Sequence, residues 1–331
     1  MNQPKISIIV PVYNPGEYFE QCLISLVSQT LTDIEIIIIL DCPTDRSDEI
    51  AKKYAERDQR IKLIYNEKNI HAGLSRNKGM EIACGEYIGF HDADDYSEPR
   101  MYELLYNKGK QNDLDAVRCN FKCIYPPNSG IKDEFYKYPA VTEDTSQKNE
   151  IYKRVCNNTV SCVVWSHIFK TEFIRKYNLQ FVDSSIVTSE DSIFFIEAYR
   201  HLDKLGIVPD CLYYHIFHQT NTGKTYKHRS VRNRISFFEK LYYFLRENNI
   251  EEKKALSYIS ENIAKSTYSA SRQALLEFPL KQALGEIRQI KENDLMMKAI
   301  SSLYEKKNKP ILSGLKPTIK IFLFLLRKWK F

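Results

Sequence analysis

Short β-branched runs that alternate with helical segments are the feature that most constrains the fold of this chain. Four such runs lie in the first hundred residues: "ISIIV" (6–10), "IEIIIIL" (34–40), "IKLIYN" (61–66) and "EYIGF" (86–90). Runs without polar alternation indicate strands that are buried on both faces. The stretches between them have helical spacing, and the last of these helices is predicted over 73–85, ended by Gly85. The alternation predicts a mostly parallel, Rossmann-like α/β sheet flanked by helices.

Polar side chains follow three of the predicted strands at the point where each strand ends. Tyr13 follows the first strand, Asp41 follows the second and Asp92 follows the fourth. The carboxyl ends of parallel strands meet at one edge of a sheet, where α/β proteins bind their ligands. The sequence therefore predicts a ligand site that these three segments share.

Charge and cysteine content narrow the class of protein. The formal charge is +6 over 331 residues, which is compatible with anionic ligands and too weak by itself to indicate nucleic acid. The eight cysteines form neither a CxxC pair nor a zinc-type spacing, so we expect reduced thiols in a cytoplasmic protein. The first residues, "MNQPKISIIVPVYN", lack the long apolar core of a secretion signal.

The stretch "GFHDADDYSEPR" (89–100) places Asp92, Asp94 and Asp95 directly after a predicted buried strand. Such close carboxylates repel one another, and either a solvated turn or a shared cation would relieve the repulsion. Mg²⁺ and Mn²⁺ accept one or two carboxylates while phosphates complete their coordination, so a metal-bound diphosphate is one occupant. The chain has no GxGxxG, GxxxxGK[ST] or DxDxT motif, which argues against dinucleotide, P-loop and aspartyl-phosphate chemistry.

Segments of the first hundred residues, in order, resemble the family 2 glycosyltransferases of the GT-A fold. The run "ISIIVPVYNPGEYFEQCLISLVSQT" resembles the family's opening strand and helix, and "IEIIIILDCPTDRSDEI" is similar to the family's "IEIIIVDDGSTDxS". The run "NIHAGLSRNKGMEIACGEYIGFHDADDYSEP" resembles "NxGxSxARNxGIxxAxGEYIxFLDxDDxxxP". Two later stretches, "VVWSHIFKTEFIRKYNLQF" and "SEDSIFFIEAYRHL", are similar to the family's second half. In the second segment Leu40 and Cys42-Pro43 depart from the family pattern.

The resemblance implies a nucleotide site in the first hundred residues. Its members contact the base, the ribose, the diphosphate or the metal, and they are Pro11, Tyr13, Asp41, Arg76, Asp92 and Asp94. Tyr13 would lie against the base, Asp41 would bond the imide edge of uracil, and Arg76 would bind the nucleotide or its diphosphate. Asp94 would be the direct ligand of Mn²⁺ or Mg²⁺, with Asp92 beside it.

The "SED" stretch at 189–191 has two compatible interpretations. As local structure, Ser189 caps a helix while Glu190 and Asp191 complement the helix dipole. The family resemblance places the catalytic base of an inverting transfer at Asp191, with Glu190 orienting the acceptor or the loop. Such a base removes the proton of the acceptor hydroxyl on the face opposite the leaving diphosphate.

Aromatic and basic residues of the second half are weaker candidates. Trp165, His167 and Asp95 are proposed to contact the acceptor, although packing would also explain the two rings. His215 and His218 have a spacing that would suit a metal pair on a helix, but their surroundings predict a strand and a loop. A basic loop over the diphosphate is the preferred interpretation, with cations at Lys224, Lys227 and Arg229.

The chain divides near residue 225 into a GT-A domain (1–225, nucleotide half 1–100 and acceptor half 101–225) and a helical C-terminal region (226–331). The segment 315–331 is rich in apolar and basic residues, lacks acids and is too short to span a bilayer. It predicts either an anchor on an anionic membrane, on the inner face of the plasma membrane, or a helix docked into a core or dimer interface.

These features together predict inverting, metal-dependent transfer from a UDP-sugar to a glycan or lipid-linked glycan in bacterial surface polysaccharide synthesis. The transferred sugar would be a hexose or an N-acetylhexosamine. A non-catalytic nucleotide-sugar-binding scaffold and a nucleotidyltransferase stay open as alternatives. A homo-oligomer is compatible with the sequence, and no nucleic-acid partner is expected.

Overall fold

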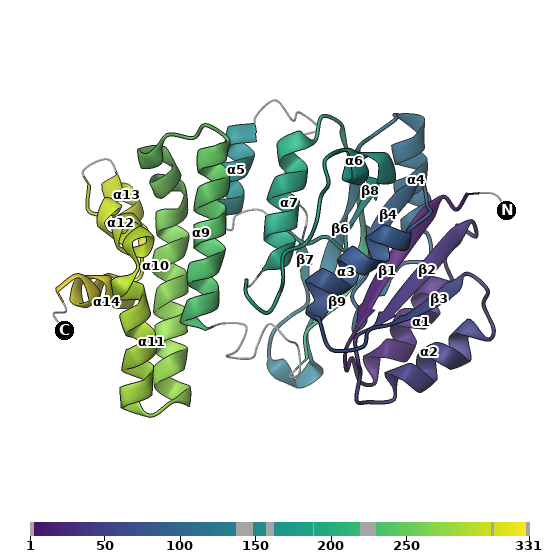
Figure 1. Ribbon diagram of the computed structural model, residues 1–331, viewed down its shortest axis with the longest axis horizontal. Coiled ribbons are helices and arrows are strands. Elements are labelled where there is room, and N and C mark those ends of the chain that lie inside the picture. Colours follow the sequence, from purple (N-terminus) through teal and green to yellow (C-terminus); the bar gives the residue numbers. More distant parts are fainter. Residues whose placement is uncertain are drawn as a thin grey trace. The chain divides into compact units, whose positions relative to one another are not determined.

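The computed structural model describes residues 3–136, 148–156, 162–187, 189–218, 230–305 and 308–328. Its contacts divide the chain into two compact units. The sheet unit comprises Met1–Lys148, Cys162–Ser184 and Glu190–Gln219. The helical unit comprises Asn149–Ser161, Ser185–Ser189 and Thr220–Phe331. Figure 1 labels the elements of both units.

The first half of the sheet is parallel, as the sequence predicts. Its strands, in the spatial order β3-β2-β1-β4, are β1 (Ile6–Val12), β2 (Ile34–Leu40), β3 (Ile61–Tyr65) and β4 (Tyr87–Phe90). Strands β2 and β4 are buried throughout, in agreement with their largely apolar sequences. The helices between these strands are α1 (Tyr18–Val27), α2 (Ser47–Ala55) and α3 (His71–Ile82).

The two faces of β1 pack against different helices. Ile8 and Val10 belong to the core cluster that contains Phe19 and Leu23 of α1. Ile9, on the opposite face, lies against Gly79 of α3, where a Cβ atom would overlap the Ile9 side chain. Alternation along the strand thus places one helix on each side of the sheet.

Helix α3 ends three residues before the glycine that was predicted to stop it. The helix ends at Ile82, and Ala83 already has an extended backbone. Gly85 has a different role, because a Cβ atom there would overlap the backbone of Ile6 and Ser7. The prediction that Gly85 ends the helix is therefore wrong, and the glycine instead permits close approach of two backbone segments.

The second half of the sheet is mixed. Its strands are β5 (Tyr96–Ser97), β6 (Ala116–Ile124), β7 (Glu134–Tyr136), β8 (His167–Lys170) and β9 (Leu205–Ile216). Strand β8 pairs antiparallel with β4 and β6, whereas β6 and β9 are parallel. Strand β5 pairs antiparallel with the end of β9, and β7 pairs antiparallel with β6. This half also contains α4 (Met101–Gln111), the short helix η1 (Pro127–Ser129), α6 (Thr171–Lys176) and α7 (Glu190–His201).

The C-terminal region is helical, as predicted. Its helices are α9 (Val231–Glu247), α10 (Glu252–Glu277), α11 (Leu280–Glu292), α12 (Asp294–Ser302), α13 (Lys309–Gly314) and α14 (Pro317–Lys328), and α5 (Lys148–Cys156) joins this unit from residue 149 onward. The Ser230 hydroxyl caps α9 by accepting a hydrogen bond from Asn233 N. Helix α10 is the centre of the unit and packs against α9, α11, α12 and α14. No helix among the described residues is both long and apolar enough to cross a bilayer.

Candidate active site

The three predicted polar positions lie at one edge of the sheet. Val12 pairs with Leu40 in the register of β1 and β2, and Ile9 pairs with Phe90 in that of β1 and β4. The strands therefore end side by side, and the residues that follow them, Tyr13, Asp41 and Asp92, emerge at the same carboxyl edge. Tyr13 is the most exposed of the three, and Pro11 lies two residues earlier, within β1.

Asp41 is buried and connects β2 to the start of α3. Its Oδ1 accepts hydrogen bonds from Asn66 Nδ2 at 2.7 Å and Ile70 N at 2.9 Å. Its Oδ2 accepts a hydrogen bond from His71 N at 2.8 Å. A carboxylate at this position compensates the first amide groups of α3, whose dipole favours a negative charge. Asp41 thus fixes the shape of the loop in addition to any role in binding a base.

The loop after Asp41, where Cys42-Pro43 replaces the Gly-Ser of the family pattern, has an unusual backbone conformation. Cys42 occupies the position of a glycine in that pattern, and its φ is +55°, in the left-handed region that favours glycine. The Cys42 thiol donates to Asn66 O at 3.1 Å. The loop therefore keeps a glycine-like turn even though a side chain occupies it.

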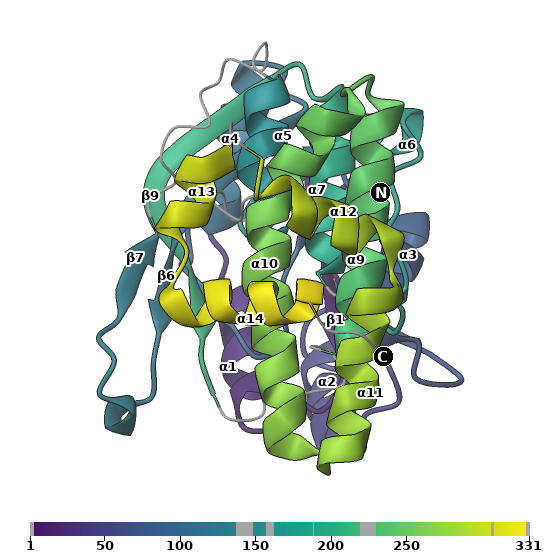
Figure 2. The same ribbon diagram turned by 90° about the vertical axis from the view of Figure 1, so that its left-hand side faces the viewer.

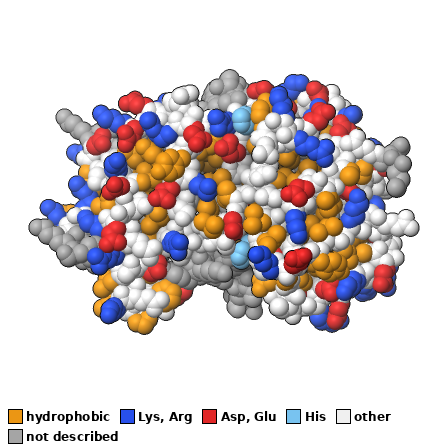
Figure 3. All heavy atoms as spheres, viewed as in Figure 1, with side chains coloured by type: hydrophobic (Ala, Val, Ile, Leu, Met, Phe, Trp, Pro, Cys, Tyr) orange, Lys and Arg blue, Asp and Glu red, His pale blue; other side chains and the backbone are white. Residues whose placement is uncertain are grey.

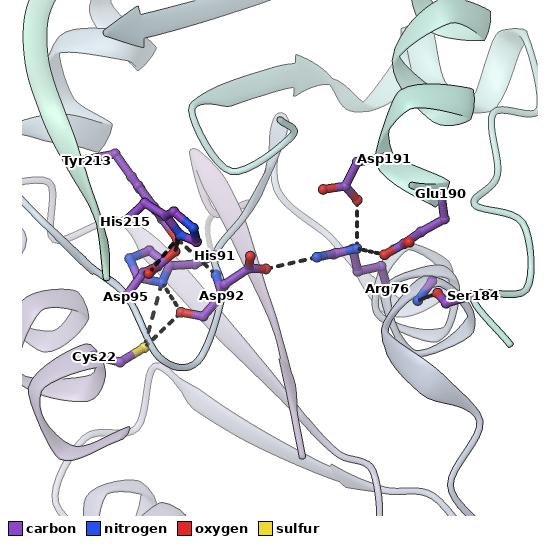
Figure 4. Close-up of polar contacts among 11 residues, drawn as sticks. Cys22, Arg76, His91, Asp92, Asp95, Ser184, Glu190, Asp191, Tyr213 and His215 are labelled. Atoms are coloured by element: carbon purple, nitrogen blue, oxygen red, sulfur yellow. Dashed lines mark hydrogen bonds and ion pairs between the residues drawn. The ribbon is translucent and has the colours of Figure 1, made fainter. Parts of the chain in front are cut away.

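Asp95 is the most deeply buried member of the acidic cluster, and its partners come from the end of β9. Asp95 Oδ2 accepts a hydrogen bond from the Tyr213 hydroxyl at 2.8 Å and lies 3.0 Å from His215 Nδ1. Asp95 Oδ1 accepts from Ile216 N at 2.8 Å. The Tyr213 hydroxyl also accepts from Asp92 N at 3.1 Å (Figure 4). These contacts fix the loop that carries all three aspartates.

The electrostatics of this contact are those of an ion pair. Burial raises the pKa of Asp95 to about 6, although the His215 charge opposes the shift. Burial by itself would lower the pKa of His215. The charge of the Asp95 carboxylate and its hydrogen bond have the larger effect and raise the pKa of His215 to about 9. Asp95 is a positioning residue in this structure, because its carboxylate is enclosed by the protein.

Asp94 contacts a histidine rather than the arginine that binds Asp92. His218 Nε2 lies 2.8 Å from Asp94 Oδ2, and the imidazole stacks on Tyr18 at 4.5 Å between ring centroids. Burial would raise the pKa of Asp94, but the hydrogen bond from His218 and the charge of His215 lower it. The carboxylates of Asp94 and Asp92 remain partly exposed, so both can be reached from solvent.

Arg76 connects the acidic cluster to the second acidic motif. Its guanidinium lies on α3, is 4% exposed and donates from Nη2 to Asp92 Oδ1 at 2.8 Å. Its Nη1 donates to Glu190 Oε1 at 3.0 Å and Asp191 Oδ1 at 2.8 Å. Figure 4 shows these carboxylates on opposite sides of the guanidinium, with Glu190 and Asp191 coming from the first turn of α7. Arg76 therefore joins two motifs that are far apart in the sequence.

Charge and burial act in opposition at this junction. Burial raises the pKa of Asp191 to about 8, Arg76 opposes that shift, and the charges of Glu190 and Asp92 add to it. The same carboxylates raise the pKa of Arg76 even though burial lowers it, so the guanidinium stays charged. A carboxyl with a raised pKa is a recurrent feature of catalytic acids and bases.

A close contact between α3 and residues 182–184 brings α7 to this place. Gly73 N donates to Ser184 Oγ at 2.9 Å, and a Cβ atom on Gly73 would overlap Val182 O. Glycine is therefore required where this segment crosses the first turn of α3. The predicted helix start at 190 is confirmed, whereas Ser189 has a φ of +60° rather than the extended conformation that is usual for an N-cap.

Three weaker candidates are buried. Trp165 stacks on Tyr213 at 4.2 Å between ring centroids and meets Phe121 edge-on at 4.6 Å. His167 lies in β8, is fully buried and stacks on Phe169. Because neither ring is exposed to a sugar in this structure, we leave both, together with Asp95, out of the proposed acceptor site. Lys224, Lys227 and Arg229 lie outside the described residues.

The residues that can hold a divalent cation are Asp94 and Asp92, with His218 beside the first. Among the described residues, no group of three or more His, Cys, Asp or Glu side chains has a metal-binding arrangement. A donor set of one or two carboxylates fits Mg²⁺ or Mn²⁺ when substrate phosphates supply the remaining ligands. The exposed oxygens at Asp94 and Asp92 meet this requirement.

The sequence alone assigns no role in the site to three residues that the structure places there: Tyr18, Tyr213 and His218. The run "YYHIFH" (213–218) follows strand periodicity, and its alternate members Tyr213 and His215 share one face. That alternation was the available signal, but it does not indicate which partner the face contacts.

An α/β sheet whose carboxyl edge carries these two acidic motifs, followed by a helical region, has the GT-A architecture. The crystal structure of residues 1–349 of S. aureus TarS in complex with UDP matches 98% of this chain and 87% of the TarS chain, with a TM-score of 0.66 and 20% identity. This likeness establishes the fold alone.

The family model for glycosyl transferase family 2 matches residues 7–177. The uncharacterized glycosyltransferase EpsJ of Bacillus subtilis is 37% identical over 218 residues, which are 63% of this chain and 60% of EpsJ. The poly(ribitol-phosphate) beta-glucosyltransferase of Bacillus spizizenii is 27% identical over 261 residues, which are 77% of this chain and 39% of that protein. The chain belongs to glycosyltransferase family 2.

Proposed function

We propose that this protein is an inverting, metal-dependent glycosyltransferase that uses a UDP-sugar and extends a glycan or lipid-linked glycan of the bacterial cell surface. Family membership supports sugar transfer. The UDP bound to TarS supports a uridine nucleotide, and the poly(ribitol-phosphate) glucosyltransferase supports a surface polymer as acceptor. A hexosyl or N-acetylhexosaminyl donor is compatible with these relatives.

One observation carries the proposal: Arg76 holds Asp92 on one side and Asp191 on the other. A donor whose diphosphate lies near Asp92 and Asp94 would place its anomeric carbon toward the start of α7. Asp191 would then accept the proton of the attacking hydroxyl, and Glu190 would orient the acceptor. Opposite positions of base and leaving group are what a single displacement with inversion requires.

A divalent cation at Asp94 and Asp92 would neutralise charge on the leaving diphosphate. Arg76 contributes by position, since its Nη atoms already bind three carboxylates. The role of Arg76 is therefore proposed as the alignment of the acidic motifs rather than direct capture of phosphate. Such alignment matters for catalysis, because a misplacement of about 1 Å can cost about a hundredfold in rate.

The nucleoside is proposed to lie against Tyr13 and Pro11, beside the loop that Asp41 stabilises. Tyr13 is the only one of these three side chains with a largely exposed surface in the described structure, so its ring is available to a base. An Asp41→Asn variant separates a role of Asp41 in binding uracil from its role in stabilising the start of α3. Loss of a uracil contact lowers UDP affinity and leaves the free energy of unfolding unchanged. Loss of the α3 contact instead lowers the free energy of unfolding, by about 1–3 kcal/mol.

The decisive experiment compares the wild-type protein with Asp191→Asn in a panel of UDP-sugars and GDP-sugars. Binding is measured by calorimetry, and released UDP is measured with and without Mn²⁺. The substitution is expected to abolish turnover and to leave UDP affinity within about threefold, since Asp191 acts on the acceptor side. Glu81→Gln is the matched control because Glu81 is exposed on α3 and lies outside the site.

Each outcome discriminates between the candidate functions. Wild-type turnover that Asp191→Asn retains excludes Asp191 as the base. Binding of UDP-sugars without turnover in any acceptor mixture favours the scaffold, and release of pyrophosphate instead of UDP favours a nucleotidyltransferase. Stabilisation by GDP-sugars alone contradicts the uracil assignment, and unchanged UDP affinity after EDTA treatment contradicts the metal site.

A further inference from the structure

Helix α14 uses only one of its two apolar sides to dock on the helical unit. Ile319, Leu323 and Leu326 are buried, and the helix packs on α10 and α12. Figure 2 shows α14 crossing in front of α10. The sequence left open whether this segment docks into a core, and these contacts show that one side of it does.

The opposite side of α14 is apolar and exposed. Ile321 is 59% exposed, Phe324 is 53% exposed and Leu325 is 59% exposed. Spacings of three and four residues place these side chains on one side of the helix, next to one another. A helix that only docks on its own domain would carry polar residues here, so a contiguous apolar side indicates a further contact.

Basic residues are frequent in the sequence of α14 and its flanks. From residue 306 to 331 the chain has eight basic residues and no acidic one: Lys306, Lys307, Lys309, Lys316, Lys320, Arg327, Lys328 and Lys330. Lys316 and Lys328 are exposed at the two ends of α14. Several Lys and Arg side chains are visible at the edge of the molecule where α14 lies (Figure 3).

Two of the cations already have partners within the helical unit. The Arg327 guanidinium lies over the Tyr304 ring at 4.0 Å, and Lys320 Nζ donates to Ser313 O at 2.7 Å. These contacts orient α14, while Lys316 and Lys328 extend from its ends. The arrangement of apolar side and basic ends is therefore held by packing.

We propose that the exposed side of α14 binds the surface of a bilayer that contains anionic lipid. Ile321, Phe324 and Leu325 would enter the boundary between headgroups and acyl chains, and Lys316 and Lys328 would contact the headgroups. The charge argues for a membrane over a protein partner, because the cores of protein interfaces are depleted of lysine. The proposal does not depend on which sugar is transferred, so it can fail while the proposed function holds.

A second exposed apolar site in the helical unit shows what distinguishes α14. Leu276 is 74% exposed and Leu280 is 66% exposed, at the turn between α10 and α11. Their neighbours Glu277 and Lys281 carry opposite charges, so this turn has no excess of cations. The turn provides a control of equal exposure without the electrostatic component.

The test is co-sedimentation of the full chain with phosphatidylcholine vesicles that contain either no or 30% phosphatidylglycerol. We expect binding only with phosphatidylglycerol, and weaker binding in 0.5 M salt because added ions screen the surface charge. Lys316→Gln with Lys328→Gln should lower the partition coefficient about 25-fold, since each basic residue contributes about fivefold at an anionic surface. Ile321→Ser, Phe324→Ser and Leu325→Ser together should lower it more than tenfold.

Leu276→Ser with Leu280→Ser is expected to leave binding unchanged, and circular dichroism verifies that every variant is folded. Equal binding to vesicles with and without phosphatidylglycerol overturns the proposal. Loss of binding only in the Leu276→Ser and Leu280→Ser variant also overturns it. Binding that survives both sets of α14 substitutions also overturns it. If the protein forms a dimer in the absence of vesicles and the triple serine variant is monomeric, this side of α14 instead binds a second copy of the chain.

Discussion

Replacing Arg76 by methionine is the most informative perturbation of the site, because one side chain contacts three carboxylates at 2.8–3.0 Å. At an effective dielectric constant near 20, one charge pair at 4 Å is worth about 4 kcal/mol. The desolvation of the guanidinium offsets much of that attraction. Removal of one partner of a buried pair leaves uncompensated charge and typically costs about 3–5 kcal/mol. We expect Arg76→Met to lower the free energy of unfolding by about that amount at pH 7.

The assay is urea unfolding followed by tryptophan fluorescence, to which Trp165, buried in the sheet unit, contributes. Arg60→Met is the matched control, because Arg60 pairs at 2.6 Å with a single carboxylate, Asp58, and donates to Val27 O. Both members of that pair are partly exposed, so we expect a smaller cost of about 1–2 kcal/mol.

The cost of Arg76→Met should depend on pH, and its sign follows from the pKa of Asp191. Burial already raises that pKa to about 8, and the lost guanidinium opposed the shift, so the pKa in the variant is higher still. A carboxyl with a higher pKa in the folded than in the unfolded state lowers the free energy of unfolding at a pH where the unfolded carboxyl is ionised. This loss of stability becomes smaller as the pH falls. The difference from wild type should therefore be smaller at pH 5.5 than at pH 8. A cost below about 1 kcal/mol, or one that is equal at both pH values, would refute the reasoning.

Three further changes test neighbouring parts of the site and the fold. Glu190→Gln removes one of the charges that add to the effect of burial on the pKa of Asp191, so the acid limb of the pH–rate profile should move to lower pH. Tyr213→Phe removes two hydrogen bonds of the acidic loop and should cost about 1–3 kcal/mol in urea unfolding. Gly79→Ala forces a Cβ atom against Ile9 and should destabilise by about 1–3 kcal/mol, with no change in UDP affinity.

The first half of the sheet could be predicted from the sequence because its signals are local. Strand β2 lies where the isoleucine-rich run of 34–40 places it, and β1, β3 and β4 differ from prediction by one or two residues at their ends. A run of isoleucines has few alternatives to a strand that is buried on both faces. The alternation of strands and helices is also a local signal, and it indicates parallel strands whose carboxyl ends lie at one edge of the sheet. Tyr13, Asp41 and Asp92 could therefore be placed together at that edge.

The partners of the charged residues could not be predicted, because they are set by tertiary contacts. Arg76 and Asp191 are 115 positions apart, and Asp94 and His218 are 124 apart. A local pattern indicates that Arg76 lies on a helix, but not that a helix from the second half brings two carboxylates to it. Gly85 shows the same limit, since glycine is favoured both at a helix stop and at a close approach of two backbones.

The acidic cluster raised the question of how three neighbouring aspartates coexist, and the protein supplies most of the answer itself. Asp92 has Arg76, Asp94 has His218, and Asp95 has His215. Repulsion among the carboxylates is therefore no longer an argument for a metal.

The case for a metal rests instead on the partly exposed oxygens of Asp94 and Asp92 and on the charge of a diphosphate that must leave. A cation bound at Asp94 would either displace the His218 contact to this carboxylate or share the imidazole as a ligand. The contact between His218 and Asp94 is therefore the one that such a cation would have to change.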